Sequence, residues 1–121
     1  MKRILIAEDV EFNRDLLVQL LEADYELLLA EDGVEAVRMA RECSPDMILM
    51  DLSLPVMNGW DATRAIKSDD QLRHIPVVAL TAHAMKADED KALAAGCDAY
   101  LTKPLDEEKL FDTIRKYTAS V

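Results

Sequence analysis

The sequence predicts an α/β fold: a doubly wound, five-stranded parallel sheet with five helices on its two faces. Short apolar runs alternate along the chain with segments of helical period. The runs Ile4–Ala7 and Met47–Met50 lack polar alternation, which is typical of parallel strands buried on both faces. Glu8 and Asp9 follow the first run, and Asp51 follows the second. Because parallel strands end at one edge of a sheet, we expect these three carboxylates to meet there.

Five strands and five helices are expected in alternation. The strands are Arg3–Glu8, Tyr25–Ala30, Asp46–Asp51, Pro76–Thr81 and Ala99–Thr102. The helices are Glu11–Ala23, Val34–Glu42, Trp60–Ser68, Met85–Ala95 and Glu107–Thr118. No linker, repeat or low-complexity segment interrupts the pattern, so residues 1–121 are expected to form one domain without an output domain.

Local signals mark several helix ends. Asp32 precedes the second helix with Glu35 three residues later, the spacing of a capping box. Asp106 is placed to cap the last helix, and Gly96 follows the fourth helix as a stop. One apolar stripe is expected to form the buried face of the first helix, namely Phe12, Leu16, Leu17, Leu20 and Leu21.

The fourth helix is expected to be the least firmly held. Most of its apolar positions are alanine, which buries little area, and Met85 and Leu93 are its larger apolar side chains. We expect it to be the movable element of the fold. An ordinary alanine-rich surface helix fits the same composition.

Composition excludes several classes of function. The net charge is −10, from 14 Lys and Arg against 24 Asp and Glu, which argues against nucleic acid as a partner. No apolar run is long enough to cross a bilayer, and the N-terminal run stops at Glu8, too early for a secretory signal. A cytoplasmic protein without membrane contact is therefore expected. Cys43 and Cys97 form no paired motif, which favours reduced structural thiols.

The strand ends carry residues suited to phosphoryl chemistry. Three clustered carboxylates repel one another unless a cation lies among them, and a hard ion, Mg²⁺ rather than Ca²⁺, fits best. Thr81 and Lys103 also fall at strand ends, where a hydroxyl and an ammonium suit phosphoryl oxygens. Asp51 stands alone at its strand end and is the best phosphoacceptor, whereas Glu8 and Asp9 can hold the metal.

Five motifs, taken together, resemble those of response-regulator receiver domains of two-component signalling. The matching pieces, in chain order, are Ile4–Asp9, Asp32–Ala36, Met50–Gly59, Pro76–Ala82 and Gly96–Pro104. They have the order and spacing of the family and extend over nearly the whole chain. The resemblance implies the flavodoxin-like strand order 2-1-3-4-5 and a stand-alone receiver of the chemotaxis or cell-division type.

The resemblance also implies an acceptor and a metal site. Asp51 would accept a phosphoryl group from the phosphohistidine of a sensor histidine kinase or a histidine phosphotransfer protein. Asp9, Asp51 and the backbone carbonyl of Ser53 would hold Mg²⁺, with Glu8 helping through a water molecule. A phosphorylated Asp51 adds charge and hydrogen-bond acceptors to the site.

A switch is implied on the neighbouring strands. Lys103 would bind the phosphoryl group, and Thr81 would move toward it. Tyr100 would turn inward as Thr81 moves, which would remodel the surface of the fourth helix, fifth strand and fifth helix. The peptide bond between Lys103 and Pro104 would be cis, as in the family. Tyr100 as a static core aromatic is the open alternative.

Alternatives to this function stay open within signalling and are weaker outside it. A phosphate sink or shuttle without a phosphorylation-dependent output would carry the same motifs, and Glu11–Arg14 resembles receivers attached to hybrid kinases, which favours a phosphorelay partner. An aspartyl-phosphate phosphatase would need a second Asp where Ser53 stands, and Glu8 and Asp9 would repel the phosphate of a flavin. We expect a phosphoacceptor and not an enzyme, beyond self-catalysed phosphoryl uptake and dephosphorylation.

Three further residues are expected to play lesser parts. His74 and His83 are expected at the surface, since no ligand spacing links them. His83 also stands where the family adjusts the lifetime of the phosphate, so that lifetime stays open. Trp60 is expected to pack partly buried at the start of the third helix.

The protein is expected to be monomeric before phosphorylation, with a dimer afterwards as the alternative.

Overall fold

The predicted alternation of strands and helices is present in the computed structural model, which describes residues 1–82 and 86–119. The strands are β1 (Arg3–Ala7), β2 (Glu26–Ala30), β3 (Met47–Asp51), β4 (Val77–Thr81) and β5 (Ala99–Thr102). The helices are α1 (Glu11–Leu21), α2 (Gly33–Cys43), α3 (Gly59–Lys67), α4 (Lys86–Ala94) and α5 (Glu107–Thr118). Each element overlaps its predicted range, and the bounds of β5 and α5 agree to the residue.

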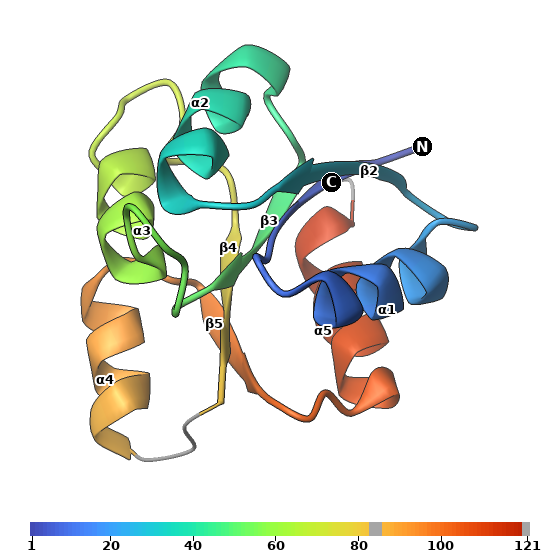
Figure 1. The fold of residues 1–121 in the computed structure, drawn as a ribbon. Helices are drawn as coiled ribbons and strands as arrows, with labels where there is room; N and C mark the ends of the chain where they lie inside the picture. Colours follow the sequence, from blue (N-terminus) through green and yellow to red (C-terminus); the bar gives the residue numbers. More distant parts are fainter. Residues whose placement is uncertain (83–85, 120–121) are drawn as a thin grey trace.

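The five strands form one parallel sheet in the order β2-β1-β3-β4-β5, which confirms the predicted doubly wound topology. Helices α1 and α5 cover one face, and α2, α3 and α4 cover the other (Figure 1). All residues of β3 and β4 are buried, which explains why their sequences are continuously apolar up to the last position. Each such buried aliphatic side chain contributes about 1.5–3 kcal/mol of hydrophobic stabilisation.

Alternate side chains of the strands divide into two cores, one on each face of the sheet. Leu5 and Ile48 pack with buried residues of α2 and α3, such as Ala36 and Ile66. Ile4, Ile6, Met47 and Leu49 pack instead with buried leucines and an isoleucine of α1 and α5, namely Leu17, Leu21, Leu110 and Ile114. Helices therefore pack against both faces of the sheet, and its carboxyl edge is held in a fixed position.

The predicted helix ends are confirmed by hydrogen bonds. The Asp32 carboxylate accepts the backbone N–H of Glu35 at 2.7 Å, and the Asp106 carboxylate accepts that of Lys109 at 3.2 Å. Gly96 has a φ of 107°, a conformation that glycine adopts without strain.

The apolar stripe of α1 is only partly buried, so its prediction was wrong for two residues. Leu17 and Leu21 are in the core, but the side chains of Phe12 and Leu16 are 77% and 41% exposed. Helical period identifies residues on one side of a helix but not how far the neighbouring element extends over them. Here both residues line a surface cavity instead, with Leu105 of the segment before α5 on its other side.

Helix α4 buries little of its surface. Among its described side chains Ala92 alone is buried, and Leu93 is 45% exposed. The predicted start of the helix at Met85, and the position of His83, lie outside the described residues. In the described part of the chain, no helix has the length and apolar character needed to span a bilayer.

Candidate functional site

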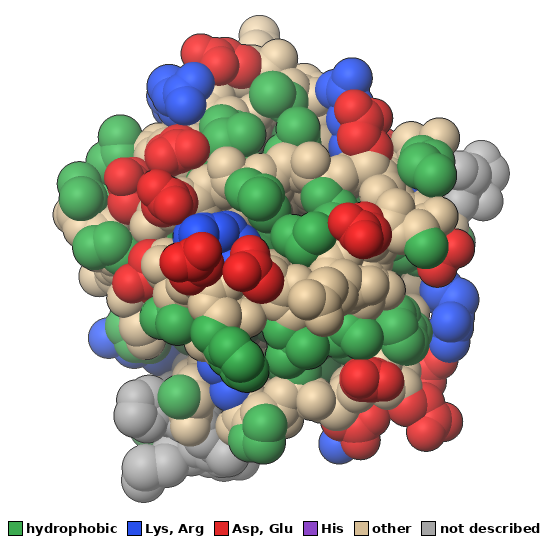
Figure 2. Space-filling model, turned by 45° about the vertical axis from the view of Figure 1, so that its right-hand side comes forward, with side chains coloured by type: hydrophobic (Ala, Val, Ile, Leu, Met, Phe, Trp, Pro, Cys, Tyr) green, Lys and Arg blue, Asp and Glu red, His purple; other side chains and the backbone are tan. Residues whose placement is uncertain are grey.

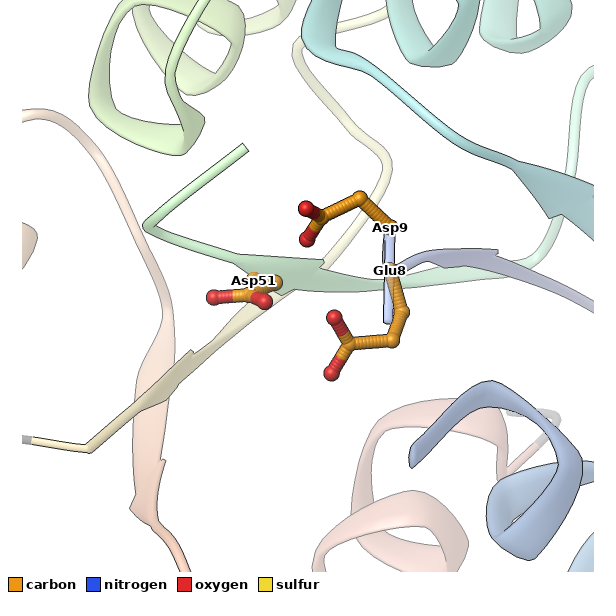
Figure 3. A group of neighbouring side chains, drawn as sticks. All are labelled: Glu8, Asp9 and Asp51. Carbon is orange, nitrogen blue, oxygen red and sulfur yellow. The ribbon is translucent and has the colours of Figure 1, made fainter. Parts of the chain in front are cut away.

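Three carboxylates meet at the carboxyl edge of the sheet. Glu8 and Asp9 follow β1, and Asp51 is the last residue of β3, which pairs beside β1 in parallel. One oxygen from each carboxylate lies within 4.8 Å of the others. Figure 3 shows Glu8 and Asp9 leaving the end of β1 on opposite sides, with both carboxylates turned toward Asp51. The predicted convergence is therefore present.

Lys103 follows β5 and reaches two of these carboxylates. Its Nζ lies 2.8 Å from Glu8 Oε1 and 3.1 Å from Asp51 Oδ2. Glu8 is fully buried, and the Lys103 side chain is 22% exposed. The predicted cis peptide between Lys103 and Pro104 is present.

Burial gives this cluster an unusual electrostatic balance. Burial and the neighbouring Asp51 carboxylate raise the pKa of Glu8 to about 6, against the opposing effect of Lys103. Burial tends to lower the pKa of Lys103, but its contacts with Glu8 and Asp51 outweigh this and leave that pKa raised. Among the described residues, Lys103 pairs with two of the three carboxylates, and the edge retains an excess of negative charge.

The remaining oxygens of the cluster show which groups can hold a metal ion. Asp51 Oδ1 accepts the backbone N–H of Ser53 at 3.0 Å, and Glu8 Oε2 accepts that of Val10 at 3.3 Å. Within the described part of the chain, the exposed Asp9 carboxylate makes no hydrogen bond or ion pair. Oxygen ligands with unbalanced negative charge fit a hard divalent cation such as Mg²⁺. Asp9 is the residue best placed to hold it, and Asp51, whose pairing with Lys103 is longer than that of the fully buried Glu8, is the next.

Thr81 and Tyr100 lie on the strands beside the cluster. Thr81 ends β4, is buried, and accepts the backbone N–H of Lys103 at 2.7 Å through its carbonyl. Tyr100 is half-buried on β5, and the nearby carboxylate of Glu89 on α4 raises the pKa of its hydroxyl. Both residues occupy their predicted strand positions.

Two residues that position Asp51 were missed from the sequence as site residues. Asn58 caps α3 by accepting the backbone N–H of Asp61 at 2.9 Å. A Cβ at Gly59 would lie 2.3 Å from the backbone oxygen of Asp51, so only glycine lets α3 begin this close to the end of β3. The signal was the Asn-Gly pair directly before the predicted third helix.

The other candidate residues lie apart from this site. His74 is exposed, as predicted, and Trp60 is partly buried against the core. Cys43 and Cys97 are free thiols, as expected, and Cys97 donates to Thr63 inside the core. Burial raises the pKa of the Cys97 thiol, which suits an inert structural role.

Comparison with known proteins agrees with this geometry. Residues 4–115 match the family model of the response regulator receiver domain. The polar-differentiation response regulator DivK of Brucella anthropi is 46% identical over 117 residues, which are 96% of this chain and 95% of that protein.

Solved structures give the same result. The receiver domain of the Pseudomonas aeruginosa sensor histidine kinase PA1611, with magnesium in its active-site cleft, has a TM-score of 0.91 and 37% identity over 98% of both chains. The receiver domain of Saccharomyces cerevisiae Ssk1, in complex with the histidine phosphotransfer protein Ypd1, has a TM-score of 0.90 and 33% identity over 97% of this chain and 88% of that one. This chain therefore belongs to the response regulator receiver domain family.

Proposed function

We propose that this receiver domain is a phosphorylation switch that accepts a phosphoryl group on Asp51 in a Mg²⁺-dependent reaction. The observation that carries the proposal is the buried ion pair of Lys103 with Asp51 beside the exposed carboxylate of Asp9. This arrangement provides a nucleophile, a cation for phosphoryl oxygens and a metal ligand at one edge of the sheet.

The geometry supports a simple transfer. An Asp51 carboxylate oxygen attacks phosphorus while the bond from phosphorus to the donor imidazole nitrogen breaks, and the imidazole keeps the electron pair. Lys103, already 3.1 Å from Asp51, then exchanges that carboxylate oxygen for a phosphoryl oxygen. Thr81, at the adjacent strand end, is placed to bind another. Mg²⁺ held by Asp9, Asp51 and the Ser53 carbonyl, with Glu8 acting through water, would neutralise the charge of the phosphoryl oxygens.

The donor that fits best is a phosphohistidine on a helical kinase or phosphotransfer domain. Exposed apolar side chains accompany the acidic edge, including Val10 next to Asp9, and Phe12 and Leu16, whose cavity reaches Glu8 and Lys103. Figure 2, which turns the α1 side toward the reader, shows hydrophobic side chains gathered between acidic ones. Apolar groups beside a charged site are suited to a protein donor, because a small donor gains little from them.

The output is proposed to pass through protein contacts of α4, β5 and α5. Tyr100 on β5 lies near Glu89 of α4, and β5 pairs with β4, which ends at Thr81, so a change at Thr81 can reach that surface. No turnover of an external substrate is proposed. Ser53 offers no carboxylic acid where an aspartyl-phosphate phosphatase needs one.

The acceptor is tested with Asp51→Asn and a small acyl-phosphate donor in Mg²⁺. Phosphate uptake, followed by mass spectrometry of the intact protein, should be abolished because the nucleophile is lost. Asp61→Asn, at an exposed carboxylate of α3 paired with Arg64, is the matched control and should behave like the unaltered protein. Uptake that survives in Asp51→Asn would move the acceptor to another residue.

A further inference from the structure

Arg14 lies beneath the acidic edge and bonds to two separate turns. It belongs to α1, and its side chain is only 15% exposed. Its Nη1 donates to the backbone carbonyl of Glu8 at 3.3 Å and lies 3.3 Å from Glu31 Oε1. Glu8 belongs to the turn after β1, and Glu31 belongs to the turn after β2. Arg14 therefore joins the turn that carries the metal-binding pair to its neighbour.

We propose that Arg14 is a positioning residue that orients Asp9 for the metal ion, an inference that rests on the proposed function of the acidic edge. The Glu8 carbonyl belongs to the peptide unit that leads into Asp9. Because that unit is planar, holding its oxygen fixes the direction in which the chain enters Asp9. The N–H of Glu8 is already held by the carbonyl of Ala30 at 3.0 Å. Arg14 thus completes the anchoring of Glu8 on its other side.

Asp9 depends on this anchoring more than its neighbours do. Glu8 and Asp51 are fixed by Lys103 and by backbone N–H groups, whereas the exposed Asp9 carboxylate has no such partner in the described part of the chain. Its position is set by the backbone alone. A partner one step removed from a metal ligand commonly changes metal affinity about 10–100-fold.

The chemistry of Arg14 suits this task better than that of lysine. Both contacts are made by Nη1, whose two N–H groups lie in the guanidinium plane, so it can hold a carbonyl and a carboxylate in fixed relative directions. Glu31 is 68% exposed, and a solvated ion pair of this kind contributes little by itself. The contact of Arg14 with the Glu8 carbonyl is therefore the one that orients Asp9, and Glu31 holds the guanidinium in place.

The charge of Arg14 and its hold on the Glu8 carbonyl have opposite expected effects on Mg²⁺ affinity, so an experiment can separate them. A guanidinium close to the acidic edge repels Mg²⁺, so removing it without any positioning role would strengthen metal binding. If Arg14 positions Asp9, its loss weakens binding. A lysine at this position keeps the charge and loses the planar fork, so it separates the two effects.

The experiment is calorimetric titration of the full chain with Mg²⁺, without phosphodonor. Arg14→Met and Arg14→Lys should each weaken Mg²⁺ binding about tenfold. Arg38→Met is the matched control, because Arg38 pairs with Glu42 on the exposed surface of α2, and it should leave the affinity unchanged.

Two outcomes overturn the inference. Tighter Mg²⁺ binding in Arg14→Met, with Arg14→Lys unchanged, would show that only charge matters. Unchanged affinity in both variants would show that the contact is structural. If Arg14→Met is too unstable to titrate, Arg14→Lys decides alone, because it keeps the charge, and unchanged affinity there would equally reject the role. Asp51→Asn tests the proposed function separately: loss of phosphate uptake in that variant, beside unchanged affinity in the Arg14 variants, removes only the role of Arg14.

Discussion

Helices α4 and α5 flank the same edge strand, β5, but they are held by different forces. Helix α5 places Leu110, Ile114 and Thr118 in the core, and Asp106 caps its start. Among the described side chains of α4, only Ala92 is buried. Polar side chains of α4 make further contacts with Tyr100 and Trp60.

The polar contacts of α4 link it to two residues near the site. The carboxylate of Glu89 lies near the hydroxyl of Tyr100 on β5 and raises its pKa, and Lys91 Nζ lies 4.0 Å from the ring centroid of Trp60 at the start of α3. An exposed contact between an ammonium and an aromatic ring is worth about 0.5–1 kcal/mol, less than one buried aliphatic side chain. Contacts of this strength can be exchanged at little cost, so α4 is suited to move and α5 to stay.

The largest expected effect tests the firmly held helix. Ile114→Ala on α5 removes a fully buried side chain and should lower the free energy of unfolding by about 2–5 kcal/mol. Leu93→Ala on α4 removes a side chain that is 45% exposed and should cost less than about 1 kcal/mol. Urea unfolding followed by circular dichroism measures both. Equal losses would show that α4 is as firmly packed as α5.

In the absence of Mg²⁺, the acidic edge makes a pH-dependent contribution to the stability of the fold through the carboxyl group of Glu8. The pKa of Glu8 is about 6 in the folded protein and near 4.5 without the fold, so the folded state favours the protonated form. Its contribution to stability is therefore full below about pH 4.5 and is lost as pH rises through about 6, by about 2 kcal/mol in all.

Glu8→Gln should remove this pH dependence. With Mg²⁺ chelated, the free energy of unfolding of the unaltered protein minus that of Glu8→Gln should fall as pH rises from 4.5 to 7. Urea titrations at several pH values measure the difference. A difference that stays flat or rises across this window would mean that Lys103 fully compensates the buried carboxylate.

The sequence was most informative where burial and register leave few choices. Asp51 and Thr81 were placed at one edge because parallel strands share their direction, and α5 was predicted to the residue because Asp106 caps it. Helix α1 ends at Leu21, earlier than predicted, where the N–H groups of Asp24 and Tyr25 turn back to its carbonyl. That turn contains no glycine or proline, so no local residue pattern predicted that the helix ends there.

Side-chain contacts between residues far apart in the chain could not be predicted from the sequence. The bonds of Lys103 to Glu8 and Asp51, and the contact of Lys91 with Trp60, join residues far apart in the chain with no shared period. Such contacts depend on side-chain directions that only the packed fold sets.

The smallest expected effect concerns the contact between Lys91 of α4 and the ring of Trp60. Lys91→Met keeps an apolar stem over Trp60 but removes the ammonium. The indole Nε1 of Trp60 is buried without a hydrogen-bond partner in the described structure, and the Lys91 ammonium lies over the face of the same ring. Amide hydrogen exchange in α4 should accelerate about two- to fivefold, and the emission of Trp60, the single tryptophan, should shift.

Helix α5 offers the matched control for this change. Lys116 lies 5.3 Å from the ring of Tyr117, so Lys116→Met removes the same kind of contact from the firmly held helix. Exchange in α5 should stay unchanged in that variant, because Leu110 and Ile114 keep the helix in the core. Equal acceleration in both helices would mean that surface lysines act through general charge. No acceleration in Lys91→Met would leave Ala92 and Tyr100 as the contacts that hold α4 on the sheet.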